Sequence, residues 1–196
     1  MLLLLLAAGA TRASAEEGVV IDAVTGAPLS GVFVIARWHG EAFRPVEPSG
    51  GCYRVQLARS GADGRFHVDF ISGNFNPLLT DRRRSIVLFK PGYEVKIFGR
   101  TFEERQALRP FAGTFAQRME QYSRVWGRDC PEARPTLRPV LEAIRAEADV
   151  LARTPEDSER VAGFQRELDT DSMGYDAALD RYLDTVQRTR RQAGTK

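Results

Sequence analysis

Residues 18–34 read GVVIDAVTGAPLSGVFV, and this stretch decides the fold that the sequence predicts. Its first β-branched run, residues 19–21, favours a strand. In the turn that follows, Gly26 can adopt a positive φ without steric cost, and Pro28 prevents a helix. A second β-branched and aromatic run then begins after a glycine. Strand, tight turn and strand in this order indicate a small β-sandwich.

Strand patterns continue along the first half of the chain. Residues 32–38 are apolar on both faces, as in a central strand. Residues 53–57 and 65–70 each alternate between apolar and polar side chains, and the short turn between them predicts a hairpin. Two later apolar runs, 85–89 and 95–98, are expected to add further strands.

Two polar stretches separate these strands. Residues 39–52 hold two prolines and three glycines, and residues 72–84 end in a basic run, so both are expected to be loops. Short strands at this spacing, divided by turns rich in glycine and proline, are typical of an all-β sandwich. We therefore expect a β-sandwich over residues 16–98.

The spacing of apolar residues changes from a strand to a helix period after Gly99. The expected apolar stripes are Phe115, Met119, Tyr122 and Trp126; Leu137, Leu141, Ile144, Ala148 and Leu151; Val161, Phe164 and Leu168; and Tyr175, Leu179, Tyr182 and Val186. Residues 154–157, TPED, supply a helix start with a capping threonine. The basic tail 188–196 is expected to be frayed. The sequence thus predicts an α+β chain with three to four helices in residues 99–196.

The first fifteen residues resemble a secretory signal. Residues 2–8 form a short apolar core, and Ala13-Ser14-Ala15 is an A-x-A cleavage site. A buried N-terminal helix is the alternative, and the apolar run is too short to span a bilayer. We therefore expect an exported protein, periplasmic or secreted, with no transmembrane segment after cleavage of residues 1–15.

A formal net charge of +2 indicates neither a nucleic-acid partner nor a membrane surface.

Export gives the two cysteines, Cys52 and Cys130, a simple interpretation. Two thiols in an oxidising compartment form one disulfide, which here would join the β part to the α part. A pair of unrelated buried thiols is the alternative. A metal site is not predicted, because neither histidine has ligand spacing to a cysteine.

Three short motifs carry a family resemblance. Residues 18–32 form the strand, turn and strand described above, residues 62–66 read ADGRF, and residues 90–93 read KPGY. In this order they resemble carboxypeptidase regulatory-like (transthyretin-like) domains over residues 18–98. The resemblance implies a prealbumin-like Greek-key sandwich of about seven strands. It implies no activity, since in metallocarboxypeptidases this module is an appendage to the catalytic domain.

The search for catalytic motifs predicts no enzyme and no cofactor. His39 and His67 begin no zinc-binding motif, and no nucleophile elbow, P-loop or dinucleotide turn is present. The histidine and arginine tail motif of transthyretin-related hydrolases is also missing. Either histidine is an exposed strand residue or a general base. An unrecognised hydrolase is therefore kept as the third functional alternative.

Two groups of residues are candidates for ligand contact. The aromatic side chains that suit a sugar platform are Trp38, Phe43, Tyr53, Phe75 and Tyr93, with core packing as the alternative. The basic run Arg82, Arg83 and Arg84 suits an anionic group or is a solvated loop. The candidate contact residues are thus Trp38, His39, Tyr53, His67, Arg82, Arg83 and Arg84.

Together these patterns predict an exported, non-enzymatic binding or structural module of a bacterial envelope. Its expected partner is an envelope protein or a polysaccharide. A carbohydrate-binding module that uses exposed aromatic side chains is the first alternative.

Overall fold

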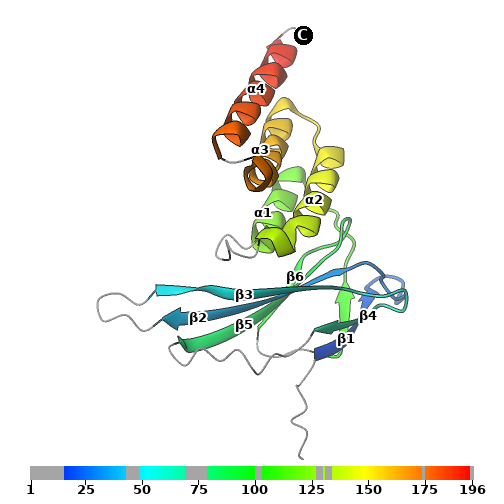
Figure 1. Cartoon of the computed structure of the whole chain (residues 1–196). Coiled ribbons are helices and arrows are strands. Elements are labelled where there is room, and N and C mark those ends of the chain that lie inside the picture. The colour runs from blue at the N-terminus through cyan, green and yellow to red at the C-terminus, as the bar shows by residue number, and fades with distance from the viewer. Residues whose placement is uncertain are drawn as a thin grey trace, which may run out of the picture.

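The computed structural model describes residues 16–42, 49–68, 79–99, 103–126, 130, 134–173 and 175–194. Within these residues the chain is α+β, as predicted, with two sheets and four helices (Figure 1). The predicted signal sequence, residues 1–15, lies outside the described part. The helices cover one face of the larger sheet, and the smaller sheet lies on its other face.

The smaller sheet has the strand order β4-β1-β7. Strand β1 (Glu16–Asp22) is central, and it pairs antiparallel with β4 (Arg65–Val68) and parallel with β7 (Arg105–Leu108). Strand β7 corrects the sequence prediction, because it lies beyond residue 98 in the segment expected to be helical.

The larger sheet has the strand order β3-β2-β5-β6, with antiparallel pairing throughout. Its strands are β2 (Phe33–Ala42), β3 (Ser49–Arg59), β5 (Leu79–Phe89) and β6 (Lys96–Phe98). One apolar core lies between the sheets, where Val34, Ala36, Ile86 and Leu88 pack with Val20, Phe66, Val68 and Leu108. Strand β2 is buried on both faces, which confirms its prediction as a central strand.

The predicted hairpin of residues 53–57 and 65–70 is wrong. Strands β3 and β4 belong to different sheets, β3 pairing with β2 and β4 with β1. The turn between them crosses from one sheet to the other, and the Ser60 hydroxyl fixes it by accepting from Val32 N and donating to Leu29 O. Gly64 is required in this turn: its φ is +74°, and a Cβ there would lie 2.4 Å from Val20 O.

The two predicted loops are shorter than expected. Strand β2 continues to Ala42 and β3 begins at Ser49, so both ends of the predicted loop 39–52 are strand. Strand β5 begins at Leu79, so the run 82–84 is also strand. The charge of residues 82–84 suggests a loop, but Arg83 and Arg84 are paired with residues of β2, and Arg82 lies between Arg83 and Thr80, which is also paired.

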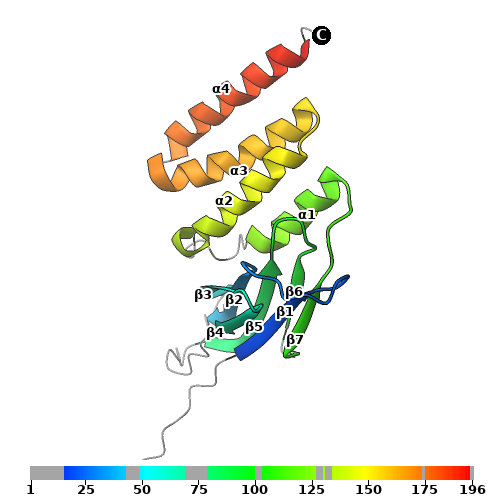
Figure 2. The ribbon, with the colours of Figure 1, turned by 90° about the vertical axis from the view of Figure 1, so that its right-hand side faces the viewer.

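Four helices follow: α1 (Phe115–Trp126), α2 (Arg134–Leu151), α3 (Pro155–Met173) and α4 (Tyr175–Gly194). The helix starting at residue 155 has the predicted Thr154 cap, whose Oγ1 accepts from Asp157 N. The prediction of a frayed basic tail from residue 188 is wrong up to Gly194, because α4 continues to that residue. Consecutive helices contact one another. Figure 2 shows α3 beyond α2 and α4 beyond α3, on the side away from the sheets.

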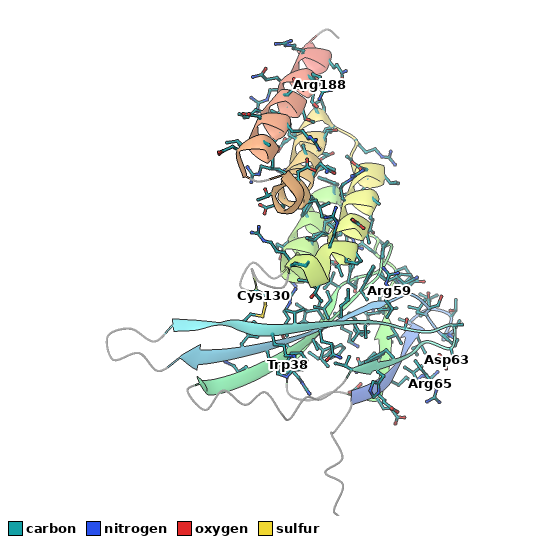
Figure 3. The ribbon with its side chains drawn as sticks, in the orientation of Figure 1. Trp38, Arg59, Asp63, Arg65, Cys130 and Arg188 are labelled. Atoms are coloured by element: carbon teal, nitrogen blue, oxygen red, sulfur yellow. A yellow bond between two sulfur atoms is a disulfide. The ribbon has the colours of Figure 1, made fainter. Side chains whose placement is uncertain are left out.

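A second core joins the helices to the larger sheet. Phe33, Ile35, Val87 and Phe89 pack with Tyr122, Val125, Leu137, Val140 and Ile144. The predicted disulfide lies at the edge of this core: Cys52 of β3 is bonded to Cys130, which follows α1, with 4.9 Å between their Cα atoms. The β part and the α part are therefore linked covalently as well as by packing (Figure 3).

Candidate functional site

Trp38 lies in a row of three side chains across the larger sheet. Strand register places Trp38 of β2 directly opposite Arg54 of β3 and Arg84 of β5. Directly opposite residues point to the same face of a sheet, so the three side chains lie side by side. Figure 3 shows Trp38 on the face away from the helices, where its half-buried side chain packs against the core between the sheets. We call these three residues the Trp38 row.

The arginine on β3 interacts with the indole directly. The guanidinium carbon of Arg54 lies 6.0 Å from the centroid of the Trp38 ring, at the outer range of a cation–π contact. Sequence analysis missed Arg54, although the alternation of residues 53–57 assigns it to the polar face. Only the register of β2 against β3 reveals that this polar position adjoins the tryptophan.

Both neighbouring strands change register next to this row. The pairing of β2 with β3 shifts between Trp38 and His39, and that of β2 with β5 shifts between His39 and Glu41. Bulges bend a sheet locally and re-aim side chains, and they are frequent beside functional sites. The Trp38 row therefore lies at the point where the pairing of β2 with both of its neighbours becomes irregular.

Two of the remaining candidates, His39 and Arg83, do not join this row. His39 is paired with Arg83, and strand alternation assigns both to the opposite face. Arg82 is in β5 and Tyr53 in β3, but both side chains lie outside the described part.

Tyr93 is the other aromatic candidate whose side chain the structure describes. Tyr93 packs against the core between the sheets, and its hydroxyl donates to Asp22 Oδ2 over 2.8 Å. Phe43 and Phe75 are outside the described residues. Of the five aromatic residues predicted to form a platform, Trp38 and Tyr93 have described side chains, and both pack against the core between the sheets, which was the predicted alternative.

His67 lies on the outward face of β4, as predicted, in a groove of about 510 Å³. Its Nδ1 is 3.2 Å from Oε1 of Glu17, the residue directly opposite on β1, and the two side chains are 49% and 72% exposed. Water screens a pair this exposed, so it contributes little to binding or stability. The described residues lining the groove include neither serine nor cysteine, so this groove offers no side-chain hydroxyl or thiol nucleophile.

Neither a metal centre nor a membrane span is found in the part of the chain that the structure describes. No group of three or more His, Cys, Asp or Glu side chains there is placed to hold a metal ion. The helices it covers are all too polar or too short to cross a bilayer.

The Trp38 row combines two kinds of recognition. An indole offers a broad apolar face on which the C–H face of a sugar ring can stack. Guanidinium groups beside it donate hydrogen bonds in a fixed plane.

No family model, no curated protein and no solved structure matches this chain.

Proposed function

We propose that this chain is an exported, non-enzymatic binding module of a bacterial envelope and that the Trp38 row binds a saccharide. A half-buried tryptophan with an arginine directly opposite it on each neighbouring strand is the observation that carries the proposal. The proposed fold is a prealbumin-like Greek-key sandwich, as in carboxypeptidase regulatory-like domains.

Two features support export. Residues 1–15 have the composition of a cleaved signal, and the cysteines form a disulfide, which persists in oxidising compartments. Intact mass measured without reductant on protein from a periplasmic or secreted fraction should show loss of residues 1–15 and of two further hydrogens. A full-length, reduced mass would contradict export.

Saccharide binding can be read from Trp38 alone. The chain has two tryptophans, so a Trp126→Phe variant leaves Trp38 as the sole indole fluorophore. Titration with soluble polysaccharides from a bacterial envelope should change the fluorescence of this variant. A matched Trp38→Phe variant, which reports Trp126, should show no change.

Retention on an immobilised polysaccharide gives an independent readout. Wild type and Trp126→Phe should be retarded on the gel, and Trp38→Ala should elute with the void volume. If none of the variants is retarded, while an envelope protein is captured equally by wild type and Trp38→Ala, saccharide binding at this row is wrong.

A further inference from the structure

The charge of the Trp38 row points to the class of saccharide, an inference that rests on the proposed function. Arg54 and Arg84 stand on either side of Trp38. Neighbouring strands are about 4.8 Å apart, so the two arginine Cα atoms are about 10 Å apart across the tryptophan. Both guanidinium groups therefore lie within reach of a single sugar ring stacked on the indole.

A neutral sugar does not need two permanent cations. Guanidinium groups donate paired hydrogen bonds to carboxylate, phosphate and sulfate, and such charge-assisted bonds are roughly twice as strong as neutral ones. Arginine also keeps its charge at all physiological pH values. We infer that the Trp38 row binds an acidic saccharide, one whose ring stacks on Trp38 while its anionic group is held by Arg54 and Arg84.

The contact between Arg54 and Trp38 supports this inference. At 6.0 Å from the ring centroid, the Arg54 guanidinium is held beside the indole before a ligand arrives. A cation that is already positioned loses less side-chain freedom when it binds an anion. The arrangement therefore favours a ligand in which an apolar ring face and an anion are adjacent.

Single-stranded nucleic acid shares these two properties, because its bases stack and its phosphates are anionic. The rest of the chain argues against it. The formal net charge is only +2, whereas nucleic-acid-binding domains carry a strong basic excess. One tryptophan in the row also suits one ring better than a run of stacked bases.

Calorimetric titration of the disulfide-bonded protein with polygalacturonate, dextran sulfate and neutral dextran tests the inference. Polygalacturonate or dextran sulfate should bind, and dextran should bind at least roughly tenfold more weakly. The preference between the first two separates a carboxylate from a sulfate ligand. Equal binding of dextran would overturn the acidic class and leave saccharide binding intact.

Variants separate the arginines from the tryptophan. Arg54→Gln and Arg84→Gln should each weaken acidic-saccharide binding by roughly tenfold, and Arg54→Lys by less. Arg138→Gln, which removes an exposed arginine of α2, is the matched control and should bind as wild type. Far-UV circular dichroism and urea unfolding establish that each variant is folded.

Three results would overturn the inference. Unchanged binding in folded Arg54→Gln and Arg84→Gln would show that the arginines do not hold the anion. Tighter binding of single-stranded DNA than of either acidic polysaccharide would replace the ligand class. Absence of binding to all three polysaccharides, with no effect of Trp38→Ala on any envelope ligand, would remove the proposed function itself.

Discussion

Arg118 of α1 and Glu147 of α2 form a buried ion pair at the junction of the helices with the sheets. Arg118 Nη2 donates to both carboxylate oxygens of Glu147, over 2.8 and 2.7 Å, and the two side chains are 0% and 10% exposed. Arg118 also donates to Tyr93 O, and Gly92 N donates to Glu147. The pair thus joins two helices to the turn of the KPGY motif.

Loss of one partner should leave the other charge buried. Glu147→Gln is expected to lower the free energy of unfolding by about 3 to 5 kcal/mol, because the Arg118 charge would lose its counterion in a dry site. Glu142→Gln, which removes the exposed partner of Arg138, is the control and should cost less than about 1 kcal/mol. Urea unfolding of both variants measures the difference, and equal midpoints would contradict the assignment.

Arg37 of β2 should hold the C-terminal end of α1. It is 6% exposed, and its guanidinium donates to the carbonyl oxygens of Arg124 and Val125 in the last turn of that helix. Those carbonyls have no partners within the helix, and the helix dipole favours a cation beside them.

Arg37→Gln should therefore lower the free energy of unfolding by about 2 to 3 kcal/mol. It should also speed amide hydrogen exchange in α1 more than in α3. Arg124→Gln, which removes an exposed i,i+4 pair with Glu120, controls for surface charge and should cost less than about 1 kcal/mol. Unchanged exchange in α1 of Arg37→Gln would show that the cap is not needed.

Asp22 should make the stability depend on acid pH. Hydrogen bonds from Thr25 N, Tyr93 OH and Val24 N lower the pKa of this carboxyl in the folded state. A lowered pKa stabilises the fold at neutral pH, and this contribution is lost as the pH falls through the pKa of the folded state.

Asp22→Asn should thus reduce stability at pH 7 and flatten its decline below about pH 4. Tyr93→Phe should shift the same profile in the same direction but by less, since the two backbone donors remain. Urea midpoints between pH 7 and pH 3 provide the measurement. A profile of Asp22→Asn parallel to that of wild type would show that the carboxyl does not titrate with folding.

Local patterns predicted the parts of the fold that depend on neighbours in sequence. Gly26 adopts a positive φ in its turn, and Phe66 and Val68 point inward, as expected. The helix cap at Thr154 follows from four consecutive residues in the same way.

Pairings between distant strands were beyond this reasoning. Strand β7 is short, lacks β-branched residues and carries Gln106 at a buried position, so only its parallel partner β1 makes it a strand. The turn between β3 and β4 has the residues of a hairpin turn, and nothing local distinguishes it from a crossing between sheets. For the same reason Arg54 was missed, since its position beside Trp38 depends on register.

The disulfide should stabilise the folded chain mainly by constraining the unfolded state. Cys52 and Cys130 are 78 residues apart, and closing a loop of this length stabilises the fold by roughly 4 to 5 kcal/mol in the chain-entropy model. The Cys52→Ser/Cys130→Ser variant should lose about that much, and wild type in dithiothreitol should match it. Hydrogen exchange should rise first at the start of α2, while the Arg118–Glu147 pair keeps the opposite end of the interface closed. If reduced and oxidised protein unfold at the same urea concentration, the bond adds nothing to the stability of the fold.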